Sequence, residues 1–137
     1  MEANTLISAI MTKKVIVADL QTKFSDIMTL FLDYRIYHLP VVENDVLIGI
    51  VSLTDALRFF RKEANNITKD EHLNEIFDIN VMMTTNPSTL GPDNTVKDAA
   101  EILSQAKFRS LPIVNEADGI VGIVSNKDLV KVLNKVI

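Results

Sequence analysis

The heptapeptide GIVSLTD at residues 49–55 returns as GIVSNKD at residues 122–128, and HLPVV at residues 38–42 returns as SLPIV at residues 110–114. The offset between copies is 72 residues for the second pair of motifs and 73 for the aspartates that end the first pair. One extra residue in a loop explains this step. Because a repeat at a fixed offset decides the architecture, we predict two similar modules related by a pseudo-two-fold axis, with paired clefts between them.

A third pair of motifs opens the two copies, with SAIMT at residues 8–12 and VMMT at residues 81–84. The copies fill the chain and are separated by its most polar stretch. We therefore predict a first repeat at residues 1–62, a linker with a short helix at residues 63–80, and a second repeat at residues 81–137.

Apolar periodicity predicts the same order of elements in each repeat, namely strand, helix, strand, strand, helix. Pro40 and Pro112 exclude a helix and precede β-branched runs that are typical of buried strands. Thr95 and Asp98 have the spacing of a capping box at a helix start. The predicted fold class is α/β (α+β), with a strand at 15–18, a helix at 24–32, strands at 41–42 and 46–51 and a helix at 52–60, followed by a strand at 87–90, a helix at 96–106, strands at 111–114 and 119–124 and a helix at 128–136.

The composition excludes several classes of protein. With 137 residues, 47% of them hydrophobic, the chain is long enough to bury a core and too apolar to be disordered. Its apolar runs are too short to cross a bilayer and its first residues are acidic and polar, so we expect no membrane insertion, no secretory leader and a cytoplasmic location. A net charge of −4 disfavours binding to nucleic acid, and with no Cys and two His we expect no metal site.

Taken together, the three repeated motifs resemble those of a tandem pair of CBS domains, often called a Bateman module, over residues 6–133. The resemblance implies that each repeat folds as βαββα and that the two pack into a disc with a cleft on each side. It implies a stand-alone regulatory protein that binds AMP, ADP, ATP, S-adenosylmethionine or a related adenosyl compound, with no required cofactor and no catalytic residue. It also implies a homodimer and a regulated partner protein, which the sequence does not identify.

The pairs Ser52 with Asp55 and Ser125 with Asp128 each stand at a predicted helix start. Unpaired N–H groups in the first turn of a helix favour an anion such as phosphate, and an aspartate accepts hydrogen bonds from vicinal ribose hydroxyls. The same spacing is also an ordinary capping arrangement, in which the serine caps the helix and the aspartate supports its dipole. Both roles are compatible.

The resemblance implies two sites, each combining residues from both repeats. One site contains Thr12, Ile16, Val17, Ile36 and Tyr37 together with Ser125, Lys127 and Asp128. The other contains Thr84, Ser88, Thr89 and Phe108 together with Ser52, Thr54 and Asp55. Several of the apolar members of these sets are equally consistent with plain core positions.

The two sites are not expected to bind alike. Lys127 and Arg109 stand in the second repeat where the first has Thr54 and Tyr37, and a nearby cation would hold a phosphate through charge-assisted bonds. Solvated surface cations are the alternative. His38 occupies a position where the family often places a phosphate-binding basic residue, although a neutral histidine satisfied by local hydrogen bonds fits as well. We expect the Lys127 site to hold a phosphorylated ligand and the Asp55 site to be weaker or empty.

Two functions of different classes therefore remain. The leading hypothesis is a sensor of an adenosine-containing ligand that signals to a partner. The alternative is a ligand-free dimerisation scaffold in which the Ser-x-x-Asp motifs serve only as helix caps. An enzyme is disfavoured, because no nucleophile and base stand at suggestive spacing and no glycine-rich phosphate loop is present.

Overall fold

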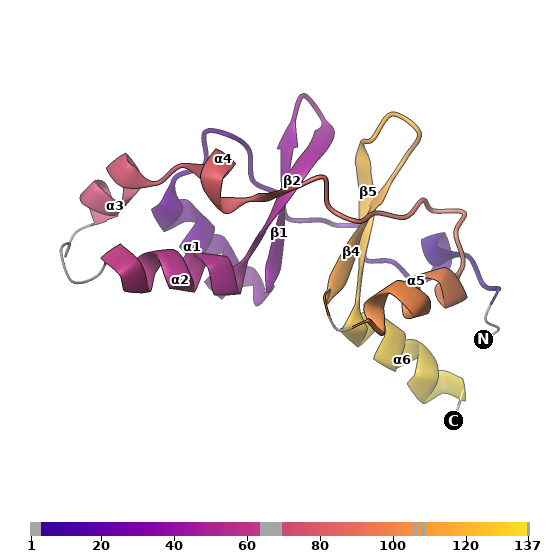
Figure 1. Cartoon of the computed structure of the whole chain (residues 1–137). Coiled ribbons are helices and arrows are strands. Elements are labelled where there is room, and N and C mark those ends of the chain that lie inside the picture. The colour runs from indigo at the N-terminus through magenta and orange to yellow at the C-terminus, as the bar shows by residue number, and fades with distance from the viewer. Residues whose placement is uncertain (1–3, 64–69, 106, 108, 137) are drawn as a thin grey trace. The chain divides into compact units, whose positions relative to one another are not determined.

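The computed structural model describes residues 4–63, 70–105, 107 and 109–136 (Figure 1). The chain divides into two compact units. The first-repeat unit comprises Ile16–Asn44 and Ile48–Pro87, and the second-repeat unit comprises Met1–Val15, Asp45–Leu47 and Ser88–Ile137. This division by contact differs from the division by repeat, because the N-terminal segment belongs with the second repeat and the linker belongs with the first.

The first-repeat unit packs helices against a three-stranded sheet of order β1-β2-β3. Strand β3 runs antiparallel to β2, with Ile50 opposite Thr84. Its elements are α1 at Phe24–Tyr34, β1 at His38–Glu43, β2 at Val46–Ser52, α2 at Leu53–Glu63, α3 at Asp70–Ile76, α4 at Ile79–Met82 and β3 at Thr84–Thr85. The first two residues of β2 are assigned by contact to the second-repeat unit. Among the described residues of the predicted linker, α3 lies wholly within it, and α4 begins in it at Ile79 and ends at Met82 in the predicted second repeat, where a single short helix was predicted.

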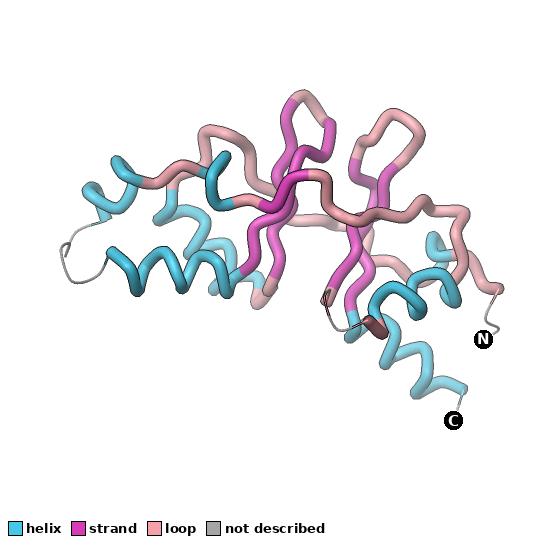
Figure 2. Tube along the Cα trace, in the orientation of Figure 1, coloured by secondary structure: helices cyan, strands magenta, loops and turns pink. Residues whose placement is uncertain are grey.

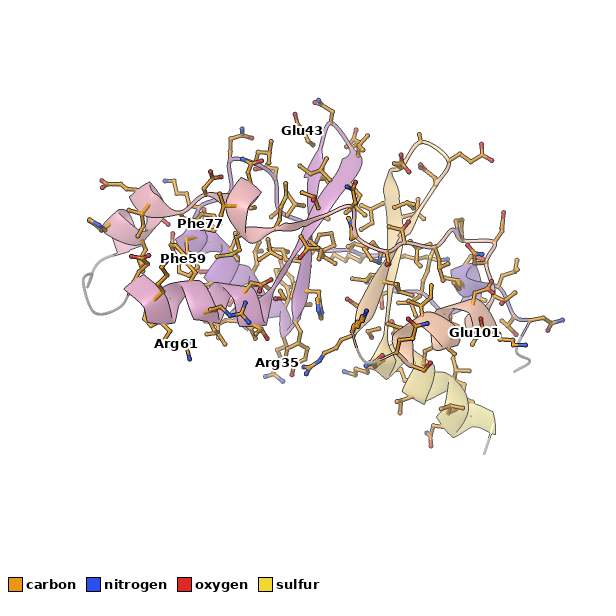
Figure 3. The ribbon with its side chains drawn as sticks, viewed as in Figure 1. Arg35, Glu43, Phe59, Arg61, Phe77 and Glu101 are labelled. Carbon is orange, nitrogen blue, oxygen red and sulfur yellow. The ribbon has the colours of Figure 1, made fainter. Side chains whose placement is uncertain are left out.

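An aromatic cluster joins the linker to the helices of the first-repeat unit. The ring of Phe24 lies 4.8 Å from that of Phe59 and 5.5 Å from that of Phe77, measured between centroids. Phe59 and Phe77 approach to 5.7 Å in an edge-on arrangement (Figure 3). Tilted and edge-on ring pairs at these distances add to the stabilisation from burial alone. Phe59 therefore packs against the linker, whereas Phe60 is 46% exposed.

The second-repeat unit contains a β-hairpin and two helices that correspond to β1, β2, α1 and α2 of the first-repeat unit. Its elements are the 3-10 helix η1 at Ile7–Ala9, α5 at Val96–Leu103, β4 at Ser110–Val114, β5 at Ile120–Ser125 and α6 at Asn126–Val136. Its core consists of fully or nearly fully buried apolar side chains from η1, α5 and the two strands, namely Ile7, Ala99, Leu103, Leu111, Ile113 and Val124. Across the described residues, no helix is both long and apolar enough to span a bilayer. The prediction of a mixed helix-and-sheet fold with two similar repeats is confirmed.

The glycines of the repeated GIVS motif receive the methionines of the repeated Met-Thr motif. A Cβ atom on Gly49 would lie 2.6 Å from Met83 Sδ and 2.9 Å from the backbone oxygen of Thr84. A Cβ on Gly122 would likewise collide with Met11 and approach the backbone oxygen of Thr12 to 3.2 Å. Only glycine permits so close an approach of a second chain segment. The two motifs are therefore halves of one packing arrangement.

The hairpin loops account for the change of offset. Between β1 and β2 the chain turns at Asn44 and Asp45, both of which have positive φ, as a two-residue turn of the twist-compatible kind requires. Between β4 and β5 the loop is longer, and the pairing shifts register between Ile113 and Val114. The extra residue of the second repeat lies in this irregular hairpin.

The predicted opening strand of each repeat is wrong, because only one residue of each segment pairs with the sheet. Ala18 forms a parallel bridge to Val41, and Leu90 forms one to Ile113. Immediately afterwards each segment turns. The Asp19 side chain accepts a hydrogen bond from the N–H of Gln21, and the Asn94 side chain accepts one from the N–H of Gly91. Figure 2 shows most of the path from β3 to α5 as loop. In both segments, a short turn held by a side-chain hydrogen bond takes the place of the strand pairing that was predicted.

The helix boundaries differ modestly from those predicted. Helix α5 ends at Leu103, and the predicted last residue, Ala106, lies outside the described residues. The capping box at its start is confirmed, because the Thr95 side chain accepts from the N–H of Asp98 and Asp98 accepts from the N–H of Thr95. Helix α6 begins at Asn126, directly after the strand, so Ser125 immediately precedes the helix and Asp128 lies in its first turn.

Candidate functional site

The start of α6 holds Ser125 and Asp128 in a reciprocal arrangement. The N–H and Oγ of Ser125 lie 2.9 Å and 3.2 Å from Asp128 Oδ2, to which both donate. The N–H of Asp128 lies 3.3 Å from Ser125 Oγ, which accepts from it. This is a capping box, and it fixes the rotamer of the Asp128 carboxylate so that Oδ1 is directed away from the serine.

Thr12 lies against this helix start although it is remote in sequence. It forms an antiparallel bridge with Ile123, with N–H to O distances of 2.9 Å in both directions. Its Oγ1 lies 3.5 Å from Asp128 Oδ1. The second-repeat unit therefore brings together a threonine hydroxyl, a serine and a carboxylate oxygen at the first turn of a helix, where backbone N–H groups lack intrahelical partners.

Two cations lie at the same end of the second-repeat unit. Lys127 is exposed in the first turn of α6. Arg109 is exposed just before β4, and its backbone oxygen accepts a hydrogen bond of 3.0 Å from the N–H of Asn126. The first-repeat unit has the equivalent bond, 2.8 Å long, from Leu53 N–H to the oxygen of Tyr37. The residue before each hairpin therefore lies beside its own helix start.

The start of α2 has the same serine but a differently placed carboxylate. The N–H of Asp55 donates to Ser52 Oγ at 3.0 Å, which caps the helix. The Asp55 carboxylate, however, accepts from Arg58, with 2.8 Å between Oδ1 and Nη1. Thr84 pairs with Ile50 in the strand leading to this turn and is exposed. The capping interpretation is thus confirmed for both serines, while the two aspartate carboxylates accept hydrogen bonds from different donors.

The remaining predicted site residues are distributed over both units. Ile16, Val17, Ile36 and Tyr37 lie in the first-repeat unit with Thr54, and Ser88 and Thr89 lie in the second-repeat unit. Ile16 and Ile36 pack against the core of the first-repeat unit. His38 is half-buried as the first residue of β1. Phe108 lies outside the described residues. The assignment of all these residues to ligand sites stays a prediction.

Two residues that the sequence did not single out adjoin the predicted sites. Ser110 is 8% exposed, and its Oγ has no hydrogen-bond partner among the described residues. It is paired directly with Ser125 across the β4–β5 hairpin, which places both side chains on one face of the sheet. Arg58 is the second such residue. Its spacing of three from Asp55 on a helix was the available signal.

Comparison with known proteins identifies the family. The family model for the CBS domain matches residues 7–62 and 73–135. Protein MJ0188 of Methanocaldococcus jannaschii is 33% identical over 127 residues, which cover 91% of this chain and 43% of that protein. The chain spans less than half the length of this and the other leading curated relatives that it matches.

Solved structures agree with this assignment. CBSX2 in complex with AMP superposes with a TM-score of 0.80 at 23% identity, covering 96% of this chain and 98% of that one. The CBS domain pair of protein MJ0100, in complex with 5′-methylthioadenosine and S-adenosyl-L-methionine, gives a TM-score of 0.75 at 25% identity, covering 94% and 99%. Two matches of the family model along one chain, in the order of the repeated motifs, confirm the predicted tandem arrangement. This chain belongs to the CBS domain family and contains a tandem pair of CBS domains.

Proposed function

We propose that this CBS pair is a regulatory module that binds an adenosine-containing ligand at its two Ser-x-x-Asp helix starts and passes the occupancy on to a partner protein. The observation that carries the proposal is the arrangement at α6, where Thr12, Ser125 and Asp128 converge on one helix start. The ligands of two neighbouring folds, AMP in CBSX2 and adenosyl compounds in the MJ0100 pair, support the choice of ligand class.

The proposed contacts follow from the chemistry of each group. Asp128 Oδ1, which is not used by Ser125, accepts a ribose hydroxyl, and the N–H groups of the first turn of α6 face the phosphate or another anionic group. Lys127 and Arg109 add positive charge at this end of the second-repeat unit. We therefore propose that a phosphorylated ligand prefers the second-repeat site to the first-repeat site, where Thr54 and Tyr37 stand instead.

The proposed module acts through association and not through catalysis. Leu57 and Phe60 on α2 are 49% and 46% exposed, and their repeat counterparts on α6, Val130 and Leu133, are 61% and 58% exposed. An apolar pair that recurs at matched positions on two helices suits a contact made by a symmetric partner. We propose a homodimer that covers these faces, with ligand occupancy read by a further, unidentified protein.

The ligand-free scaffold is the second candidate, and the capping bonds of Ser52 and Ser125 favour it, since they give both motifs a structural role. The two candidates differ in whether ligand stabilises the folded protein. A ligand that binds only the folded state at 100 times its Kd raises the free energy of unfolding by about 2.7 kcal/mol.

The test is thermal unfolding with AMP, ATP, S-adenosylmethionine and 5′-methylthioadenosine at millimolar concentration. We expect at least one of them to raise the Tm of the wild type, and we expect most of that rise to be lost in Asp128→Asn. The matched control is Asp98→Asn, which changes the same kind of capping carboxylate at the start of α5 and leaves the ligand-induced rise unchanged. Absence of any rise with all four compounds would overturn the sensor and favour the scaffold.

A further inference from the structure

The two repeated aspartates hold different partners. Among the described residues, Asp128 accepts only from neutral groups, namely the N–H and Oγ of Ser125 and, at 3.5 Å, the Oγ1 of Thr12. Asp55 is bonded to a cation one turn further along the helix, with Arg58 Nη1 2.8 Å from its Oδ1. No described cation lies within 4.0 Å of the Asp128 carboxylate. The difference therefore lies in where the two side chains point and in their charge environment.

Arg58 has a counterpart that does not behave in the same way. With the offset of 73 that relates Asp55 to Asp128, Arg58 corresponds to Lys131 on α6. Lys131 is exposed and forms no ion pair within the described residues. An ammonium is a flexible point charge, whereas a guanidinium offers a planar set of N–H donors that suits a carboxylate. The guanidinium of Arg58 engages Asp55, whereas the ammonium of Lys131 does not engage Asp128 within the described residues.

From this difference we propose that Arg58 is a specificity-determining residue that weakens the first-repeat site by competing for Asp55. The inference rests on the proposed function, in which this aspartate accepts the ribose hydroxyls. Asp55 has two alternative states in this proposal. In one it is paired with Arg58, as in the structure. In the other it turns back to the N–H of Ser52, as Asp128 does to Ser125, and so adopts the geometry of the second-repeat site.

The competition is balanced finely enough to be shifted by a ligand. The side chain of Arg58 is 64% exposed and that of Asp55 is 30% exposed, and exposed ion pairs contribute about 0.2–1 kcal/mol. Releasing Arg58 therefore costs a ligand roughly a 1.4- to 5-fold loss of affinity. Arg58 has space to move, because it borders a hollow of about 470 Å³ with Phe59, Phe77 and Met82 among its lining residues.

The test measures binding at the first-repeat site alone. Isothermal titration of the full chain in the Asp128→Asn background, at low ionic strength, uses 5′-methylthioadenosine and AMP as separate probes. We expect Arg58→Gln to tighten binding of 5′-methylthioadenosine about 1.4- to 5-fold, because this neutral probe gains the ribose contact and loses no phosphate contact. Lys131→Gln is the matched control and leaves the affinity unchanged. Added salt reduces the difference between Arg58→Gln and its parent, since it screens the ion pair.

A second readout needs no ligand. Removal of Arg58 frees Asp55 to accept from the Ser52 N–H, so in Arg58→Gln the Ser52 amide proton resonance moves downfield, toward that of Ser125. An unchanged Ser52 resonance overturns the switch. Unchanged or weaker binding of 5′-methylthioadenosine overturns the competition, and weaker binding of AMP alone would make Arg58 a phosphate ligand instead. A wild type that binds neither probe overturns the proposed function, while the amide readout still decides whether Arg58 controls Asp55.

Discussion

The hydroxyl group of Ser110 is polar, buried and without a partner among the described residues. A buried hydroxyl that makes no hydrogen bond loses its interaction with water and gains nothing in return, at a cost of about 1–3 kcal/mol. Its cross-strand neighbour Ser125 is in the opposite situation, since its hydroxyl both donates and accepts. The two serines of one pair therefore have opposite effects on the stability of the ligand-free protein.

This contrast gives a prediction for two matched substitutions. Ser110→Ala raises the free energy of unfolding of the ligand-free protein by roughly 1 kcal/mol, because the unpaired hydroxyl is removed. Ser125→Ala lowers it by about 0.5–2 kcal/mol, because the cap of α6 is lost. Urea unfolding of the ligand-free variants measures both. A loss of stability in Ser110→Ala would mean that its hydroxyl is hydrogen-bonded after all.

At the residue scale, the sequence predicted the serine caps but not the donor from which each aspartate carboxylate accepts. The spacing of Ser52 and Asp55 is the same as that of Ser125 and Asp128, so local pattern alone predicts the same arrangement twice. In the structure the Asp55 carboxylate accepts from Arg58, whereas the Asp128 carboxylate accepts from Ser125, and we attribute this difference to the proposed competition between Arg58 and Ser52 for Asp55. Such competition is decided by side-chain geometry and exposure, which spacing does not encode.

At the scale of single elements, α5 shows how strongly a complete cap holds its carboxylate. Asp98 accepts from the backbone N–H of Thr95 at 2.9 Å and from the Asn94 side chain at 3.3 Å. These hydrogen bonds favour the ionised form and lower the pKa of Asp98 below its ordinary value of 3.8, with the Thr95 backbone bond as the largest cause. Protonation of Asp98 therefore weakens the start of α5.

The pH dependence of stability follows from this direction. Because the folded-state pKa of Asp98 is lower than the unfolded one, its contribution is fully present above pH 3.8 and is lost as the pH falls through the lower folded-state value. We expect the wild type to lose more stability than Asp98→Asn between about pH 5 and pH 2. Urea midpoints across that range test this, with Asp93→Asn, an exposed carboxylate in the same loop, as the control. Parallel curves for wild type and Asp98→Asn would contradict it.

The elements themselves were predictable to different degrees. Helices with a continuous apolar stripe, such as α1, and most hairpin strands were placed within a few residues because burial imposes their period, although β1 begins at His38, three residues before the strand predicted at 41–42. The opening strands were not, since an apolar run such as residues 15–18 is buried equally well as a strand or as an extended segment with a single bridge. Only the backbone partners distinguish these cases.

At the scale of the whole molecule, the repeated apolar faces of α2 and α6 make a prediction about assembly. If a second copy covers them, Val130→Glu places a charge in the interface and shifts the protein toward a monomer, as measured by analytical ultracentrifugation at several concentrations. Leu32→Glu is the control, because Leu32 on α1 is 75% exposed and has no part in the repeated faces. An unchanged oligomeric state in Val130→Glu, or a wild type that is already monomeric, would exclude this dimer.

The duplication predicted from sequence is present, but the repeats are not the compact units. The N-terminal segment belongs to the unit built mainly from the second repeat, and the linker belongs to the unit built mainly from the first. A methionine in the N-terminal segment and one just after the linker each lie against a glycine of the same unit, with Met11 on Gly122 and Met83 on Gly49. The spacing of the repeats shows which motifs are equivalent in the two copies. It does not show which motifs contact each other, because that depends on the tertiary structure.

The placement of Thr12 against α6 has a consequence for the order in which the protein is made. Thr12 and Asp128 are 116 positions apart, so at about 5–20 residues per second the ribosome adds Asp128 roughly 6 to 23 s after Thr12. The first-repeat unit needs nothing beyond Pro87 and can form during synthesis. The second-repeat unit needs both early and late residues, so the apolar Ile7, which is fully buried in the finished protein, stays without its core neighbours in the nascent chain until α5 and the β4–β5 hairpin have been made.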